Sequence, residues 1–252
     1  MAGHSKWANI KHRKASQDAK RGKQFGKYIR AIEVAAKEAN SSDAEQSPSL
    51  ALAMQKAKDG DVPKDTIDRA AKRGAGELGD AAAYEQVQYE GYATGGVAVL
   101  VDCLTDNKNR TAMEIRNAFT KVGGNLAEPG AVAFMFTRRG QVVIEAAGVD
   151  EDELMVVGLD AGMEDLEADD GQFIAWCDAS DLTDLRAELE RHGYEVARAE
   201  APMVPASHTP VEDPGDAGKV LRLIDALEDN DDVQDVWANF DIPDQLLEEL
   251  EV

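Results

Sequence analysis

The chain has very little cysteine and no long run of apolar residues. Its 252 residues include two cysteines, Cys103 and Cys177, and each lies in a short apolar stretch typical of a buried strand. This pattern indicates two buried thiols in a reducing compartment and argues against a disulfide scaffold or a redox pair. No stretch approaches the ~20 apolar residues that a membrane span needs, and the basic N-terminus lacks the apolar run of a secretory signal. We therefore expect a globular protein of two or three domains, without a membrane segment.

Basic residues are scarce except near the N-terminus. The chain has 27 Lys and Arg against 49 Asp and Glu, a formal net charge of -22. Residues 1–73 hold 16 of the bases and 9 of the acids, whereas the remaining residues hold 11 bases and 40 acids. The first part therefore attracts phosphate, and the second repels it and favours solubility. Such asymmetry predicts a protein that presents one basic face to a nucleic acid.

Residues 16–39 have the pattern of an amphipathic helix. The side chains at Phe25, Ile29, Ile32 and Ala36 recur at spacings of four, three and four residues, which places them on one helical face. A basic stripe runs along the same helix roughly 150° from the apolar one; its members are Lys20, Lys23, Lys27, Arg30 and Lys37. We expect the apolar face to pack on neighbouring helices and the basic face to look outward.

Two shorter helices complete a small basic helical domain. The Ser-rich stretch 40–49 predicts a loop, and a helix with Leu50, Met54 and Ala57 aligned follows it. The last helix is expected to begin at 61–65, with Asp61 as its cap and Pro63 in the first turn.

The rest of the chain mixes strands and helices. Strands are predicted at 84–92, 97–104 and 131–136, with a helix over 108–122. Residues 141–200 then follow the β-α-β-β-α-β order of a ferredoxin-like unit. A proline-rich linker, a helix near 220–227, a strand at 233–240 and a tail helix end the chain. Because a lone helix and strand make no domain, we expect them to pair with 84–137, which makes the ferredoxin-like unit an insertion.

The fold class expected is therefore α+β, with an N-terminal all-helical basic domain followed by two α/β, ferredoxin-like domains, the last inserted in the middle one. The expected boundaries are 1–78 for the basic helical domain, 79–137 plus 206–252 for the α/β domain, and 138–205 for the insertion.

The candidate nucleic-acid-binding residues all lie in or just before the first helix. They are Lys6, Trp7, Lys11, His12, Arg13, Lys14, Lys20, Arg21, Lys23, Lys27 and Arg30. A basic stripe can also be a plain solvated face, and residues 6–14 can be either an arm ordered on binding or a tail packed on its own domain. Trp7 can stack on a base or simply anchor this segment. His4 and His12 lack partners at metal-ligand spacing, so no metal site is expected.

The loop at 105–111, TDNKNRT, lies between a predicted strand and a predicted helix. Asp106 or Asn107 can cap that helix. As an alternative, Asn107, Lys108, Asn109 and Arg110 can offer polar contacts to RNA or to a protein partner. Glycines 91, 95 and 96 precede a strand, which suits a tight turn and not a dinucleotide fingerprint. No Ser, Cys, carboxylate or metal-based catalytic set is recognisable, so we expect no enzyme activity and no cofactor.

Several segments resemble the YebC family, which includes the mitochondrial translational activator of cytochrome oxidase. The similar segments are MAGHSKWANIKHRK at the start, PKDTIDRAAKRG at 63–74, YEGYATGGVAVLVDCLTDNKNRT at 89–111, GGNLAEPGAVAFMF at 123–136 and ALEDNDDVQDVWANFDI at 226–242. The resemblance implies three domains with the third inserted in the second, cytoplasmic residence in bacteria, and control of gene expression linked to nucleic acid. It implies either a DNA-binding transcriptional regulator or a translation factor acting at the ribosome.

The sequence thus favours a non-enzymatic nucleic-acid-binding regulator, taken first as a DNA-binding transcriptional regulator in the cytoplasm. The alternative is a ribosome-associated factor that binds RNA through shape and phosphate contacts. A ligand-sensing regulator is a third class that rests on fold analogy alone. We expect a monomer, because no heptad repeat or long apolar surface helix offers a self-complementary interface.

Overall fold

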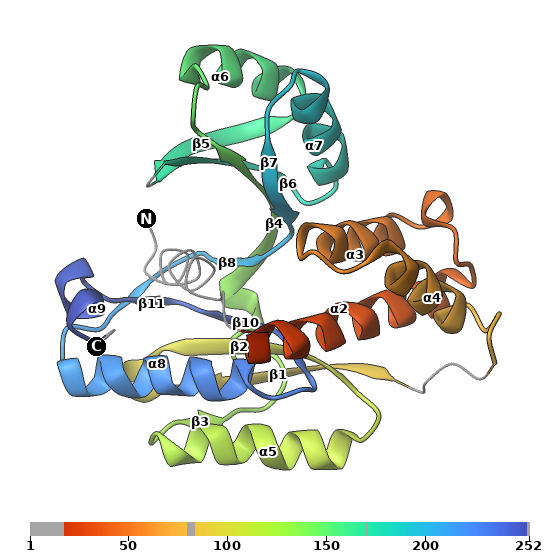
Figure 1. Ribbon diagram of the computed structural model, residues 1–252. Coiled ribbons are helices and arrows are strands. Elements are labelled where there is room, and N and C mark those ends of the chain that lie inside the picture. The colour runs from red at the N-terminus through yellow and green to blue at the C-terminus, as the bar shows by residue number, and fades with distance from the viewer. Residues whose placement is uncertain (1–17, 80–83, 170, 251–252) are drawn as a thin grey trace.

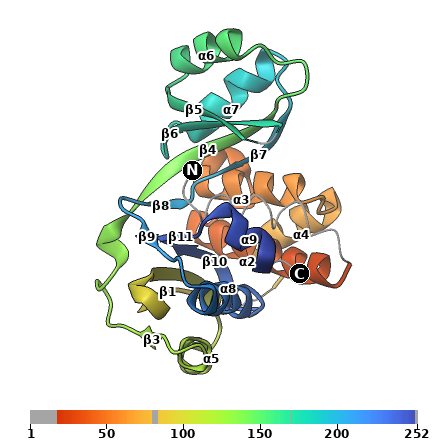
Figure 2. The same ribbon diagram turned by 90° about the vertical axis from the view of Figure 1, so that its left-hand side faces the viewer.

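The computed structural model describes residues 18–79, 84–169 and 171–250. Three parts are arranged one above another, with an inserted α/β part at the top of Figure 1 and the middle α/β part at the bottom. The N-terminal helices lie between these two parts on one side of the molecule, as the perpendicular view in Figure 2 also shows. This arrangement brings the basic helical domain into contact with both acidic parts of the chain.

The N-terminal part is built from α2 (Asp18–Ala39), α3 (Pro48–Asp59) and α4 (Lys64–Gly74), with a short 3-10 turn η1 (Ala44–Gln46) between the first two. Ile32 and Ala36 of α2 are fully buried, and Phe25 and Ile29 pack against the same core. The predicted apolar stripe is therefore confirmed. The expectation that Asp61 caps α4 is wrong, because the helix begins after Pro63 without a side-chain cap and Asp61 has a φ of 60° in the preceding turn.

The middle part is a four-stranded sheet in the order β10-β2-β1-β3. Its strands are β1 (Glu85–Tyr92), β2 (Ala98–Thr105), β3 (Asn125–Leu126) and β10 (Val233–Ala238). The helices α5 (Lys108–Lys121) and α8 (Pro214–Glu228) contribute Ile115, Phe119, Val220 and Ile224 to the core on one face of this sheet. β10 pairs with β2, so the expected return of the last strand to the middle part is confirmed. Short pieces complete this part: η2 (Thr94–Gly96), β9 (Thr209–Pro210), β11 (Phe240–Asp241) and α9 (Asp244–Leu250).

Of the three glycines predicted to form a tight turn before β2, two do so and one does not. Gly95 and Gly96 have φ values of 75° and 78° in the tight turn between β1 and β2, as expected. Gly91 lies instead within β1, where a Cβ atom would lie 2.6 Å from the ring of Phe119. Its role is close packing of the strand against α5, not turn formation.

The predicted strand at 131–136 is wrong. Residues Ala133–Met135 form a 3-10 turn, η3, and the next strand, β4, begins at Phe136 and continues to Glu145. β4 pairs with strands of the inserted part and not with the middle sheet. The loop before it is shaped by hydrogen bonds to a buried carboxylate, which local sequence patterns do not reveal.

The inserted part has the ferredoxin-like order that the sequence predicts. Its sheet runs β5-β6-β4-β7, and β8 also pairs with β4. The remaining elements are β5 (Met163–Asp169), β6 (Gln172–Asp178), β7 (Val196–Glu200), β8 (Met203–Pro205), α6 (Glu151–Asp160) and α7 (Leu182–Arg191). Leu154 of α6 and Leu185 of α7 are fully buried in its core.

The α+β fold class with a helical N-terminal part is confirmed, while the exact domain boundaries remain predictions. None of the helices in the described part of the chain is long and apolar enough to cross a membrane.

Candidate nucleic-acid interface

Only part of the predicted nucleic-acid-binding set lies where the structure describes side chains. Lys6, Trp7, Lys11, His12, Arg13 and Lys14 are outside the described residues. Lys20 and Arg21 belong to α2, but their side chains are not described. Lys23, Lys27 and Arg30 are therefore the members of the set whose side chains the structure describes.

These three cations of α2 converge on the C-terminal end of α8. Lys27 Nζ donates to the backbone oxygen of Glu228 at 2.7 Å, and Lys23 Nζ donates to that of Asp229 at 3.2 Å. The guanidinium of Arg30 donates to the backbone oxygen of Asp231. Lys27 is only 7% exposed. The basic stripe thus forms an internal contact between the helical domain and the middle part.

The expectation that this whole stripe faces outward is therefore wrong for Lys27 and Arg30. The last turn of a helix leaves carbonyl groups without intrahelical partners, and its end carries a partial negative charge. Lysine and arginine are the side chains that satisfy both needs. The sequence of α2 by itself cannot reveal the end of α8 as its partner, because α8 follows about 200 residues later.

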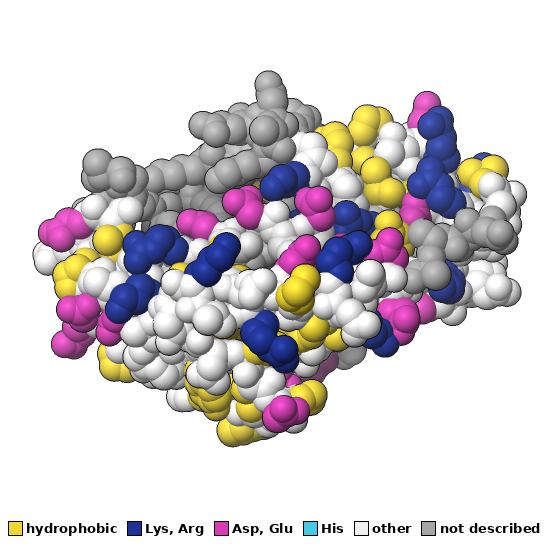
Figure 3. Space-filling view, turned by 90° about the horizontal axis from the view of Figure 1, so that it is seen from below, with side chains coloured by type: hydrophobic (Ala, Val, Ile, Leu, Met, Phe, Trp, Pro, Cys, Tyr) yellow, Lys and Arg dark blue, Asp and Glu magenta, His cyan; other side chains and the backbone are white. Residues whose placement is uncertain are grey.

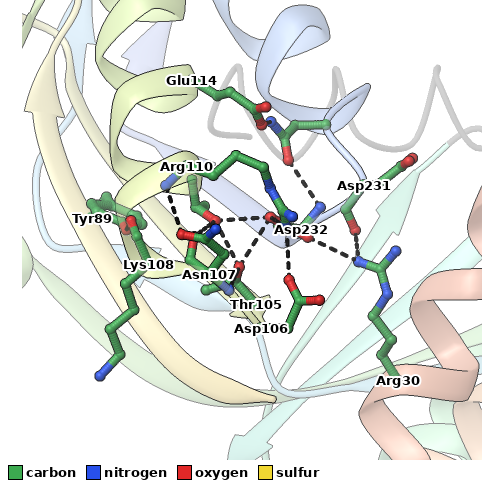
Figure 4. Close-up of polar contacts among 12 residues, drawn as sticks. Arg30, Tyr89, Thr105, Asp106, Asn107, Lys108, Arg110, Glu114, Asp231 and Asp232 are labelled. Carbon is green, nitrogen blue, oxygen red and sulfur yellow. Dashed lines mark hydrogen bonds and ion pairs between the residues drawn. The ribbon is translucent and has the colours of Figure 1, made fainter. Parts of the chain in front are cut away.

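A buried polar cluster lies beside this contact and is centred on Asp232 (Figure 4). Its Oδ2 accepts hydrogen bonds from Thr111 Oγ1 at 2.8 Å, Thr105 Oγ1 at 3.1 Å and Arg110 Nη2 at 2.7 Å. Arg30 Nη1 lies 3.5 Å from Oδ1 on the other side. Burial alone would raise the pKa of Asp232, but the bonds from Arg110, Thr111 and Thr105 outweigh it and lower that pKa. The cluster therefore holds an ionised carboxylate between three segments of the chain.

The loop at 105–111 mainly supports this cluster. Asn107 caps α5 by accepting a hydrogen bond from the amide of Arg110 at 3.1 Å, so the capping interpretation is confirmed. Lys108 forms an ion pair with Glu85, and Asn109 is exposed. The alternative role in contacting RNA or a protein stays a prediction, and Arg110 is already engaged by Asp106 and Asp232.

A pocket of about 290 Å³ opens next to the cluster. Arg30, Tyr84 and Arg110 line it together with acidic and amide side chains of the loops at 106 and 230–232. The guanidinium of Arg30 lies 5.7 Å from the centre of the Tyr84 ring, a cation–π distance. Asp232 pairs with both arginines and Asp106 also pairs with Arg110, so each guanidinium that lines the pocket already has a carboxylate partner among the described residues.

A second ionic contact joins α3 to both acidic parts. Lys56 Nζ lies 3.2 Å from Asp235 of β10, and this carboxylate raises the pKa of Lys56. Asp59 receives two hydrogen bonds from Arg186 of α7, at 2.6 and 3.0 Å. Sequence analysis missed these residues because charged side chains on exposed-looking helix faces carry no sign of a partner in another domain.

Other cations of the helical domain are exposed to solvent. Five of them have no ion pair or hydrogen bond among the described residues: Lys37, Lys58, Lys64, Arg69 and Lys72. Arg73 is also exposed but pairs with Glu33 at 2.6 Å. Residues 22–77 hold ten bases and nine acids, whereas residues 1–21 hold six bases and one acid. Most of the positive excess of the domain therefore precedes the described side chains.

The face seen in Figure 3 has no single-sign patch. Lys and Arg side chains are interspersed there with Asp and Glu. A surface of this kind favours solubility and offers a polyanion few uninterrupted contacts.

The structure also bears on the thiols and on metal binding. Cys103 and Cys177 are free and buried, and burial raises their pKa values to about 12 and about 11. The prediction that both thiols are buried and unpaired with one another is confirmed. Within the described ranges, no group of three or more His, Cys, Asp or Glu side chains is placed to hold a metal ion.

Replacing Lys27 by methionine is expected to lower the melting temperature by about 4–8 °C. Methionine keeps the apolar stem but removes a charged hydrogen bond, a loss of about 1.5–3 kcal/mol in a buried site. Thermal unfolding followed by circular dichroism measures the effect. Lys37→Met on the same helix is the matched control and should change the melting temperature by less than about 2 °C, because Lys37 is exposed. Equal shifts in the two variants would contradict the buried contact.

Comparison with known proteins identifies relatives of this chain. Residues 5–77 match the model of the TACO1/YebC protein N-terminal domain, and residues 84–240 match that of the TACO1/YebC second and third domain. A protein of Halothermothrix orenii is 51% identical over 252 residues, with 99% of each chain covered. A protein of Beutenbergia cavernae is 52% identical over 252 residues, covering 100% of this chain and 99% of the relative. Both carry the name "Probable transcriptional regulatory protein".

A solved structure shares the fold. The crystal structure of a conserved hypothetical protein from Aquifex aeolicus superposes with a TM-score of 0.81 at 42% sequence identity. The alignment covers 90% of this chain and 93% of the Aquifex chain. The two domain models together span nearly the whole sequence, and the relatives align from end to end. The chain therefore belongs to the TACO1/YebC family.

Proposed function

We propose that the chain is a non-enzymatic, nucleic-acid-binding regulator of gene expression that acts in the cytoplasm as a DNA-binding transcriptional regulator. The observation that carries this proposal is the division of charge, with 16 bases and 9 acids in residues 1–73 against 11 and 40 in the rest. A domain of this charge beside so acidic a body presents one region to phosphate and keeps the remainder away. The regulatory name of the relatives supports the same conclusion.

The phosphate contacts proposed are of two kinds. Residues 6–21 supply six bases in the sequence, and the exposed cations of α3 and α4 supply the others. On α4, Lys64, Arg69 and Lys72 are exposed and have no ion pair among the described residues. Phosphate contacts of this sort position a protein on a nucleic acid without reading its sequence.

A ribosome-associated translation factor that binds RNA is the second candidate. The observation that favours it is the position of α2, whose basic face lies against α8 and is not free to enter a major groove. A factor that recognises RNA needs shape and phosphate contacts more than a base-reading helix.

Binding to nucleic acid is expected to weaken steeply with salt. If about five phosphates are engaged, the slope of log affinity against log salt concentration is about −4 to −5 on duplex DNA. No short operator should be preferred over random duplex by more than about tenfold, or 1.4 kcal/mol. Fluorescence anisotropy with competing duplexes and a structured ribosomal RNA fragment measures both quantities. Light scattering alongside should report a monomer.

A set of charge variants tests where the contacts lie. Changing Lys64, Arg69 and Lys72 together to glutamine should lower affinity about tenfold or more for every sequence. The control changes Arg116, Lys121 and Arg222 to glutamine, which removes the same charge from exposed sites on the body. Equal losses in both variants would overturn the assignment to the helical domain. A thousandfold operator preference would establish sequence reading, whereas flat DNA binding with saturable, tighter binding to ribosomal RNA would favour the translation factor.

A further inference from the structure

The end of α8 offers α2 a run of acceptors that resembles a short stretch of nucleic acid backbone. Four carboxylates lie within the five residues 228–232. Three backbone oxygens in the same segment accept hydrogen bonds from Lys23, Lys27 and Arg30. The negative end of the helix dipole adds to this charge. A single DNA strand presents one negative charge about every 3.4 Å. The end of α8 and a nucleic acid backbone therefore offer the same kind of acceptor to the same three cations.

We propose that this acidic end of α8, residues 228–232, is an autoinhibitory competitor that withholds the basic face of α2 from phosphate. In the closed arrangement described here, Lys23, Lys27 and Arg30 are bound to α8. When a polyanion reaches the domain, the three cations exchange their α8 acceptors for phosphate oxygens. The inference rests on the proposed function, since it assumes that the helical domain meets a nucleic acid.

The outer part of the contact is built to be displaced. The side chains of Lys23 and Asp229 are 51% and 67% exposed and lie 4.0 Å apart. Exposed pairs of this kind stabilise a contact only weakly and are screened by salt. Lys27 and the Arg30–Asp232 pair are more deeply placed and hold the closed state. Displacement therefore begins at Lys23 and proceeds inward.

The second contact keeps the domain attached while α2 changes partner. Lys56 with Asp235, and Asp59 with Arg186, tie α3 to the middle and inserted parts. Leu52 of α3 also packs against the core of the inserted part. The acidic segment thus stays close to α2 and acts at a high effective concentration. The apparent affinity for nucleic acid is then the intrinsic affinity multiplied by the fraction of molecules in the open state.

Neutralising the exposed part of the segment tests the competition. The variant Asp229→Asn with Asp231→Asn should bind a random 30-base-pair duplex about fivefold more tightly than the unchanged protein at 0.1 M salt. The control, Glu151→Gln with Asp152→Asn, removes the same charge from exposed positions on α6. It should change affinity less than about twofold. Equal gains in the two variants would overturn the proposal, because net charge alone would then explain them.

Locking the contact tests the same idea in the opposite direction. In the variant Lys23→Cys with Asp229→Cys, a short bismaleimide can bridge the two exposed thiols, whereas the native Cys103 and Cys177 are buried. The bridged protein should bind the duplex at least fivefold more weakly than the same variant before bridging. Equal affinity for the duplex before and after bridging would contradict the proposed competition, while the proposed nucleic-acid binding would still stand. If the unchanged protein binds no duplex and no RNA, the proposed function itself fails.

Discussion

Replacing Asp232 by alanine is expected to destabilise the protein by about 3–5 kcal/mol, a large part of the stability of an ordinary domain. The side chain accepts hydrogen bonds from Thr105, Thr111 and Arg110, and it lies 3.5 Å from Arg30. Alanine leaves two buried hydroxyl groups and two guanidinium groups without this acceptor. Asparagine keeps one oxygen acceptor but loses the charge, so Asp232→Asn should cost less than alanine. Thermal and urea unfolding of the two variants measure which of them loses more free energy of unfolding.

The pH dependence of the same variants provides a second measurement. The pKa of Asp232 is lowered in the folded protein, since the hydrogen bonds from Arg110, Thr111 and Thr105 outweigh burial. Its contribution is therefore fully present above its unfolded pKa of about 3.9 and is lost as the pH falls through the folded pKa. The stability difference between the unchanged protein and Asp232→Ala should shrink below about pH 4.

The neighbouring Asp231 supplies the control. Its side chain is exposed, and only its backbone oxygen contacts Arg30. Asp231→Asn should therefore change the free energy of unfolding by less than about 0.5 kcal/mol. If Asp231→Asn and Asp232→Ala were equally destabilising, acidity of the segment and not the buried cluster would be responsible.

The helix α2 illustrates how far sequence patterns reach. The 3.6-residue spacing of its apolar side chains places Ile32 and Ala36 in a core, and the structure confirms this. The basic stripe on the other side is equally regular, yet periodicity cannot tell water from a second domain as its neighbour. Lys27 became buried because a distant helix end supplies a better acceptor than solvent. The residue pattern of α2 therefore predicted the helix and the burial of its apolar face, but not the surroundings of its basic face.

The α/β body shows the same limit. The order of strands and helices in residues 141–200 predicts the ferredoxin-like insertion, because each element carries its own periodicity. Residues 131–136 are as apolar as a strand, but Ala133–Met135 form a 3-10 turn and only Phe136 belongs to a strand. Asp232 lies in an acidic run that resembles a solvated loop, although it is 6% exposed. Long-range hydrogen bonds decide such positions, and composition does not encode them.

Glu90 is the clearest case in which contacts between residues far apart in the sequence determine the local structure. It lies in β1 and is 6% exposed. Its carboxylate accepts hydrogen bonds from the backbone amides of Gly130 and Val132, both at 2.6 Å, and of Ala133 at 2.8 Å. Burial by itself would raise the pKa of Glu90, but these three amides outweigh it and lower that pKa. One side chain thus fixes the turn that replaces the predicted strand.

Replacing Glu90 by alanine is accordingly expected to cost about 3 kcal/mol or more and to free the loop at 127–135. Three amides lose a charged acceptor, and hydrogen bonds to charged groups contribute about 1.5–3 kcal/mol in mutational series. Hydrogen exchange at Gly130, Val132 and Ala133 should accelerate at least tenfold, while exchange in β6 of the inserted part stays slow. Thermal unfolding should show a lowered melting temperature, and the difference from the unchanged protein should narrow below about pH 4.

Glu128→Gln is the matched control because this carboxylate is exposed in the same loop. It should leave both exchange and melting temperature nearly unchanged, and an equal effect would contradict the anchoring role of Glu90. The loop also carries Phe134, whose side chain is 78% exposed. Because this ring is exposed, it buries little apolar surface and adds little to the stability of the loop, whereas the hydrogen bonds to the Glu90 carboxylate hold the backbone in one shape. Glu90→Ala should therefore broaden the ring resonances of Phe134, and sharp, unchanged resonances would show that the loop keeps its shape without the carboxylate.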